Sequence, residues 1–168
     1  KAVIWDLQTA KPVTTLGAEG SHFQGVAFSP DGKNVFTAGD DGIVRQWDVE
    51  GGKELRKFED HTGPVANVAA SPDGVRLAST DNSGVRVWDT RTGKQFHHLI
   101  GHAVPDEFKA ISTLTIDAVT FSADGRLLLT EANDESARLW DPLAGREIRK
   151  LSEHDGSTAS LDLSPDGA

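Results

Sequence analysis

SPDGVRLASTDNSGVRVWD, residues 71–89, is the stretch that decides the fold. It opens with the turn Ser71-Pro72-Asp73-Gly74, continues into an apolar run, turns again at Asp81-Asn82, and ends in a second apolar run on Trp88-Asp89. Both runs are short and rich in branched residues, and Gly, Pro and Asp separate them, which is typical of strands joined by tight turns. The stretch therefore predicts β-structure.

Both ends of this stretch recur along the chain. Trp-Asp begins at residues 5, 47, 88 and 140, and turns of the SPDG type begin at residues 29, 71, 122 and 164. Two independent markers therefore share one period near 42 residues, lengthened once by about 10. A fixed period of this size indicates a repeat architecture, so it takes priority over any local motif.

Each full unit reads as four strands, and no stretch shows sustained helical periodicity. Counting strands by this pattern gives two at the start, three units of four, and one at the end. We therefore expect one domain over residues 1–168. Its units are a partial one at 1–18, full ones at 19–59, 60–100 and 101–152, and a partial one at 153–168.

Four strands per repeat with a closing Trp-Asp resembles the WD40 repeat family, whose members are β-propellers. The resemblance covers nearly the whole chain and implies an all-β fold of four-stranded antiparallel blades, about four of them, in a partial or shared propeller. The tandem SPDG turns look like those of bacterial WD-repeat arrays. Fold resemblance alone does not supply a function.

The number of repeats raises the question of how the propeller closes. Rings of this family commonly have about seven blades, which needs about 300 residues at this period, and the chain has 168. It also contains no methionine, which indicates a processed product or a piece of a longer protein. Three readings stay open: the rest of the propeller belongs to the same parent chain or another chain, two copies assemble, or four blades close on themselves.

The resemblance also implies a structural hydrogen-bond network, because a Trp, a Ser or Thr, a His and an Asp are linked within each blade of the family. The matching residues are Thr37, Asp41 and Trp47 in one unit; His61, Ser79 and Trp88, with Asp81 or Asn82, in the next; and His102, Thr130, Asp134 and Trp140 in the third. The first of these units departs from the pattern. His22 lies too close to its turn, and Glu19 stands where the spacing would place a histidine.

The insertion lies at residues 103–116, AVPDEFKAISTLTI. Its apolar residues Phe108, Ile111 and Leu114 are candidate contacts for a protein partner, since insertions in surface loops often carry function. Two alternatives stay open: the segment folds as a small lid onto its own blade, or it is a disordered insert.

Composition narrows the function classes. The net charge is −9, with 26 acidic and 17 basic residues, which disfavours a nucleic-acid binder. No run approaches the roughly 18 apolar residues of a membrane span. The absence of cysteine excludes disulfides and thiolate chemistry. It fits a reducing compartment, so we expect a cytoplasmic protein. We also expect that the protein needs no cofactor.

The leading hypothesis is a non-catalytic scaffold that binds proteins or peptides, as the docking or sensor part of a larger protein. Ser or Thr, His and Asp together resemble a hydrolase triad, but a set that recurs in every unit argues for scaffolding, because an enzyme needs one exposed site. The alternative is a propeller-fold enzyme or a metal-binding module near His97, His98, Asp106 and Glu107. Adjacent strand residues point to opposite faces, which weakens that cluster.

Overall fold

The structure is a computed structural model that describes residues 1–17, 20–104, 113–152 and 163–164. The described residues form fourteen strands in four sheets. We call the two-stranded sheet the half blade and the three four-stranded sheets the first, second and third blades. The half blade holds β1 (Ala2–Asp6) and β2 (Lys11–Leu16); the first blade β3 (Phe23–Phe28), β4 (Asn34–Gly39), β5 (Val44–Asp48) and β6 (Glu54–Phe58); the second β7 (Asn67–Ala70), β8 (Arg76–Asp81), β9 (Gly84–Asp89) and β10 (Gln95–Leu99); the third β11 (Ile116–Phe121), β12 (Leu128–Ala132), β13 (Ser136–Asp141) and β14 (Arg146–Ser152).

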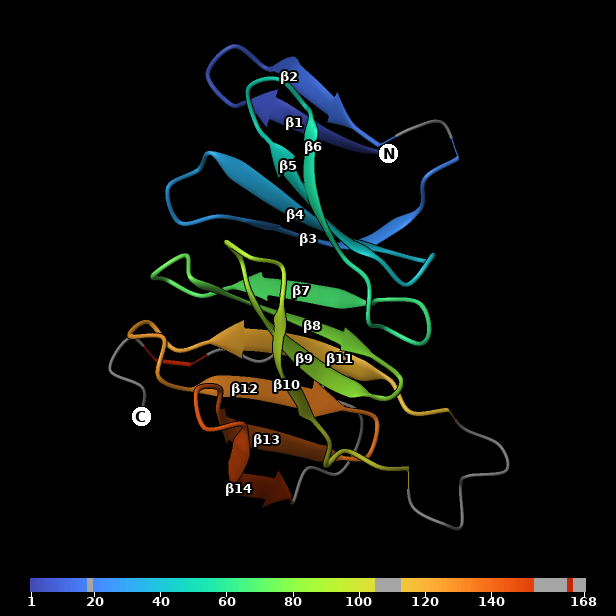
Figure 1. The fold of residues 1–168 in the computed structure, drawn as a ribbon, viewed down its shortest axis with the longest axis vertical. Helices are drawn as coiled ribbons and strands as arrows, with labels where there is room; N and C mark the ends of the chain where they lie inside the picture. The colour runs from blue at the N-terminus through green and yellow to red at the C-terminus, as the bar shows by residue number, and fades with distance from the viewer. Residues whose placement is uncertain (18–19, 105–112, 153–162, 165–168) are drawn as a thin grey trace.

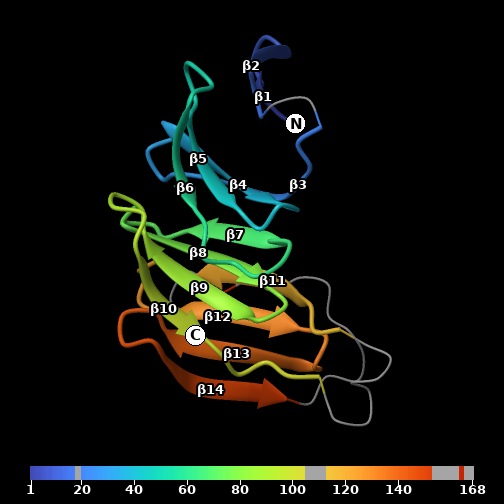
Figure 2. The same cartoon turned by 45° about the vertical axis from the view of Figure 1, so that its right-hand side comes forward.

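Every four-stranded sheet follows the same path: the strands pair antiparallel with their neighbours in chain order. The sheets then stack in chain order, as Figures 1 and 2 show, and the first strand of each blade packs on the first strand of the next. The prediction of an all-β fold with four-stranded antiparallel blades is confirmed. The described residues form part of a propeller.

The SPDG sequence explains the turn between the first two strands of each blade. The hydroxyl of Ser29 donates to Asp31 Oδ1 at 2.6 Å and accepts the backbone N–H of Asn34 at 2.9 Å, which closes the turn. Gly32 has a φ of +68°, a left-handed conformation that glycine adopts without steric cost. Ser71 and Ser122 make the same two kinds of bond in the later blades, so one turn design serves all three.

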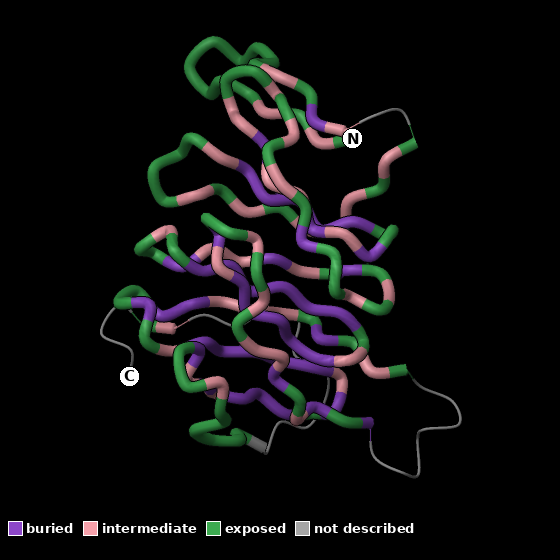
Figure 3. Tube along the Cα trace, in the orientation of Figure 1, coloured by how far each residue is buried: buried purple, intermediate pink, exposed green. Residues whose placement is uncertain are grey.

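The hydrophobic core lies between the sheets. Three clusters of buried side chains fill the spaces between the half blade and first blade, the first and second blades, and the second and third blades. The second strand of each blade is almost entirely buried, as the purple segments of Figure 3 show for β4, β8 and β12. Because the sheets bury both faces only when stacked, each blade depends on its neighbours for stability.

Because neighbouring strands are antiparallel, the loops and turns that connect them lie at two opposite ends of the stack. The SPDG turns and the turns that follow Trp-Asp lie at one end, on the left in Figure 1. We call this end the turn end. The remaining connections, which include both described flanks of the insertion, lie at the opposite end, the loop end. Two surfaces with different side chains are thereby presented on one rigid support.

Candidate functional site

In the second blade, a buried tryptophan begins a chain of hydrogen bonds. Trp88 Nε1 donates to Ser79 Oγ at 2.8 Å, and Ser79 Oγ lies 2.6 Å from His61 Nε2. His61 Nδ1 lies 3.0 Å from Asp81 Oδ2, so Asp81, and not Asn82, is the acidic residue of this blade. Burial lowers the pKa of His61 below its ordinary value, and this exceeds the opposing effect of the Asp81 carboxylate.

The third blade repeats the chain with threonine in place of serine. Trp140 Nε1 donates to Thr130 Oγ1 at 2.8 Å, and His102 Nε2 lies 2.8 Å from the same hydroxyl. His102 Nδ1 lies 3.0 Å from Asp134 Oδ1. Burial alone would raise the pKa of Asp134, but the hydrogen bonds from His102 and Ser136 hold it well below its usual range.

The first blade has only part of this arrangement. Trp47 Nε1 donates to Thr37 Oγ1 at 2.8 Å, but no described histidine contacts that hydroxyl. Asp41, whose side chain is 51% exposed, instead binds the guanidinium of Arg45 through two bonds of 3.0 and 2.6 Å. The ring of Phe23 meets Trp47 edge-on with centroids 6.2 Å apart, where the later blades place His61 and His102 beside their tryptophans.

These networks link the strands within each blade, and they are not accessible to a substrate. The hydroxyls of Thr37, Ser79 and Thr130 belong to residues with no exposed surface, and each accepts an indole N–H. A nucleophile needs an open approach and an oxyanion site beside it. The chemistry available to these sets is therefore hydrogen bonding within the fold.

The alternative cluster around the paired histidines does not assemble within the described residues. His97 Nε2 lies 2.9 Å from the carbonyl oxygen of Leu143, and the His98 ring lies beside Ser83 on the neighbouring turn. Asp106 and Glu107 lie outside the described residues. In the part of the chain that the structure describes, no three His, Cys, Asp or Glu side chains gather as metal ligands would.

Of the three candidate partner contacts in the insertion, Phe108 and Ile111 lie outside the described residues. Leu114 is half-buried and packs against the core cluster between the second and third blades. It also lines a groove of about 260 Å³ at the loop end, together with Gln24, Pro64, Asn82 and Ile116. This groove is mainly apolar and brings together residues from all three blades.

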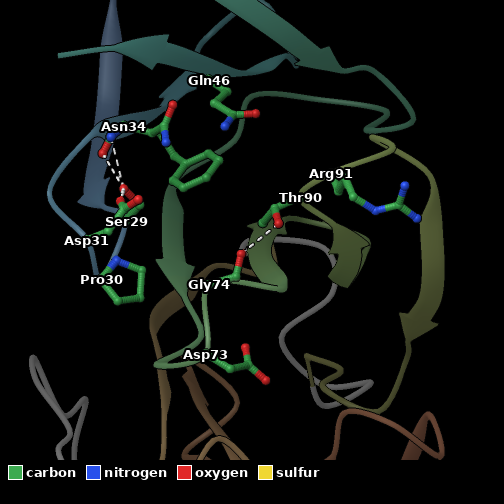
Figure 4. Close-up of a pocket in the computed structure, with 10 residues that line it drawn as sticks. Ser29, Pro30, Asp31, Asn34, Gln46, Asp73, Gly74, Thr90 and Arg91 are labelled. Carbon is green, nitrogen blue, oxygen red and sulfur yellow. Dashed lines mark hydrogen bonds between the residues drawn. The ribbon is translucent and has the colours of Figure 1, made fainter. Parts of the chain in front are cut away.

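A second cavity was not anticipated from the sequence. A polar pocket of about 300 Å³ opens at the turn end between the first and second blades, and Figure 4 shows its lining. Asp31 and Asn34 line it from the first blade, and Gly74 and Thr90 line it from the second. The available signal was a departure from the repeat: the second unit has Arg76 where the first has Asn34. We call this cavity the Asn34 pocket.

No helix in the part of the chain that the structure describes is long and apolar enough to cross a membrane.

Comparison with known proteins agrees with the geometry. The pattern of the family "WD domain, G-beta repeat" matches residues 10–48, 52–89 and 93–141. The guanine nucleotide-binding protein subunit beta of Zea mays is 28% identical over 99% of this chain and 46% of its own length. The target of rapamycin complex subunit wat1 of Schizosaccharomyces pombe is 28% identical over 97% of this chain and 52% of its own length.

A solved structure has the same fold. The structure of U3-55K superposes with a TM-score of 0.73 at 21% identity, and covers 84% of this chain and 42% of that one. The chain spans about half the length of the curated relatives named above. Since the family pattern matches most of the chain, and each match contains a Trp-Asp strand, the chain belongs to the WD40 repeat family.

Proposed function

We propose that this chain is a non-catalytic scaffold for protein–protein interaction and acts as the docking or sensor part of a larger protein. The observation that carries the proposal is the apolar groove at the loop end. It gathers Gln24, Pro64 and Leu114 from three successive blades beside the insertion. Exposed apolar surfaces of this kind mark sites where proteins or other ligands bind.

Rigidity supports the same role. The strands beneath the groove are held by two complete hydrogen-bond networks and by continuous packing between the blades. A binding surface on a fixed support loses little entropy when it binds a ligand. Two of the named relatives are, by their names, subunits of larger assemblies. These points favour docking over catalysis.

Several finer proposals follow from sequence alone. We propose a cytoplasmic protein with one domain, bounded by the repeat units given above. We also propose that the rest of the propeller comes from the same parent chain or from a second copy. A bacterial-type array rests only on the SPDG turns, and the named curated relatives come from a plant and a fungus.

The test compares two leucines at opposite ends of the strands. Tagged wild type, Leu114→Ser and Leu143→Ser are used in pull-downs from cell lysate, and the recovered proteins are identified by mass spectrometry. Leu143, which is exposed in the turn after β13, serves as the matched control. We expect Leu114→Ser to lose partners that wild type and Leu143→Ser both retain, with thermal melting showing that all three are folded. Equal recovery of every partner by the two variants would refute a docking role for the groove.

A further inference from the structure

Two equivalent residues of the repeat face the spaces between blades with very different side chains. Asn34 and Arg76 each follow the turn aspartate by three residues and each begin the second strand of a blade. Arg76 faces the space between the second and third blades, whereas Asn34 faces the space between the first and second. The molecule therefore contains the same repeat position twice between blades, once with a long cation and once without.

The Arg76 site shows how a guanidinium is bound there. Arg76 Nη2 donates to Asp73 Oδ2 at 2.8 Å, and the guanidinium carbon lies 5.9 Å from the centre of the Phe121 ring. The group lies against Gly125, where an added Cβ would come within 3.2 Å of Nη2. The side chain is only 7% exposed. A turn carboxylate, an aromatic ring and a glycine of the next blade thus enclose the cation.

The Asn34 pocket shares the turn carboxylate and the glycine of the Arg76 site, but it lacks the cation. Asp31 occupies the place of Asp73, and Gly74 occupies the place of Gly125. The ring of Phe36 forms part of the wall, although it comes from the second strand of the first blade and not from the next blade. The shorter Asn34 side chain leaves the volume that an arginine side chain fills in the other site.

The pocket offers hydrogen-bond acceptors to a ligand that carries hydrogen-bond donors. The bonds that Asp31 accepts from Ser29 Oγ and from the Lys33 backbone both end on Oδ1, which leaves Oδ2 for a ligand. The Ser29 hydroxyl bond lowers the pKa of Asp31, so this carboxyl group is ionised at neutral pH. Figure 4 shows the side-chain amides of Asn34 and Gln46 on neighbouring strands above Asp31, where their oxygens offer further acceptors.

One cation also lines the pocket. Arg91 comes from the turn after Trp88-Asp89, and in Figure 4 its guanidinium extends away from Asp31 and Asn34, at the far side of the pocket. The chain as a whole has a net charge of −9, which attracts cationic ligands at long range.

We propose that the Asn34 pocket binds the guanidinium group of an arginine side chain presented by a partner protein. Asp31 Oδ2 accepts from the guanidinium as Asp73 Oδ2 does from Arg76, and the ligand lies against Gly74. Guanidinium suits this site better than ammonium because its planar donors reach a carboxylate and several amide oxygens at once. That the arginine comes from a protein rests on the proposed scaffold role, whereas recognition of the guanidinium does not.

The experiment titrates the full chain with N-acetyl-arginine methylamide and, separately, with the corresponding lysine derivative, while amide signals are followed by NMR. We expect saturable shifts centred on Asp31 and Gly74 with the arginine compound, and weaker binding of the lysine compound. Asp31→Asn removes the charged acceptor and should weaken binding by roughly tenfold or more, the usual cost of losing a charge-assisted bond. Asn34→Arg should abolish binding, because it places the chain's own guanidinium in the pocket.

The third blade supplies the control. Asp124 occupies the same turn position as Asp31, and Asp124→Asn should leave the titration unchanged. Absence of saturable binding, equal affinity for the lysine compound, or undiminished binding by Asp31→Asn or Asn34→Arg would each overturn the proposal. Since no partner protein is used, failure here and failure of the pull-down comparison at Leu114 are separate results.

Discussion

Trp5 and Trp88 occupy the same position of the repeat, yet their surroundings differ completely. Trp5, in the half blade, is 56% exposed, whereas Trp88, in the second blade, is 1% exposed. Strand β9 pairs with β8 and β10, and the Trp88 indole reaches Ser79 on β8. Strand β1 pairs only with β2 among the described residues. The Trp-Asp motif therefore predicts a strand, but it does not predict whether the tryptophan is buried. Burial of the tryptophan depends on the neighbouring strand of the blade.

The three complete blades also differ in the extent of their hydrogen-bond networks. In the second and third blades the hydroxyl links tryptophan to histidine, and histidine to aspartate. In the first blade the hydroxyl of Thr37 bonds only to Trp47 among the described contacts, and the half-exposed Asp41 pairs with the largely buried Arg45. Three tryptophans with the same 2.8 Å bond thus belong to networks of unequal extent.

The largest effect should separate Trp88 from Trp5. Trp88→Ala should destabilise the fold by about 3–5 kcal/mol, because it opens a cavity between the first and second blades and leaves Ser79 without its donor. Trp5→Ala should cost about 1 kcal/mol, since more than half of its surface is exposed. Urea denaturation of the two variants measures the difference. Equal losses would mean that the half blade is as tightly packed as the complete blades.

A smaller effect should separate Thr130 from Thr37. Thr130→Val removes the acceptor of Trp140 and the partner of His102, which leaves two buried polar groups unpaired, at a cost of about 2–4 kcal/mol. Thr37→Val leaves only the Trp47 N–H unpaired, so about 1–2 kcal/mol is expected. The comparison uses the same substitution and matched buried sites. A cost for Thr37→Val equal to that for Thr130→Val would show that the extended network adds no stability.

The smallest effect concerns pH. Burial lowers the pKa of His61 in the folded state, so the unfolded state binds more protons below about pH 6.5, and the free energy of unfolding should fall as pH drops from 7 to 5. One such group changes stability by at most about 1.4 kcal/mol per pH unit. His61→Gln should reduce this slope, because it removes the buried imidazole. Denaturation curves at several pH values provide the test, and an unchanged slope in His61→Gln would contradict it.

Acid should act further through the carboxylates. The pKa values of Asp81 and Asp134 are depressed, because the hydrogen bonds each accepts outweigh the opposing effect of burial. Their contribution to stability is fully present above about pH 4 and is lost as pH falls below that value. The effect of His61 on stability therefore appears at a higher pH than the effects of Asp81 and Asp134.

The repeat pattern of the sequence predicts the all-β architecture. The shared spacing of two markers predicts repeats of four strands, and the resemblance to the WD40 family implies that each repeat forms a propeller blade. The SPDG turn is explained by the bonds of Ser29 and Asp31 and by the left-handed conformation of Gly32. The choice between Asp81 and Asn82 was left open, because the second unit is one residue short and spacing alone does not fix which carbonyl-bearing side chain faces His61. The structure places Asp81 there.

Surface features were harder to anticipate because they arise between units. The Asn34 pocket depends on one short side chain in the first blade and on Gly74 from the next blade. A pattern read along a single unit does not show that these two residues meet. Likewise, Leu114 was a candidate contact in the insertion, but its place on the core cluster depends on how the second and third blades stack.

The single pairing partner of β1 has a consequence for how the molecule opens. Backbone N–H groups on the β1 edge away from β2 have no described strand to bond to, and few buried contacts hold the half blade in place. Amide hydrogen exchange should therefore be fastest in β1 and β2 and slowest in β8 and β12, with local opening well below the free energy of global unfolding.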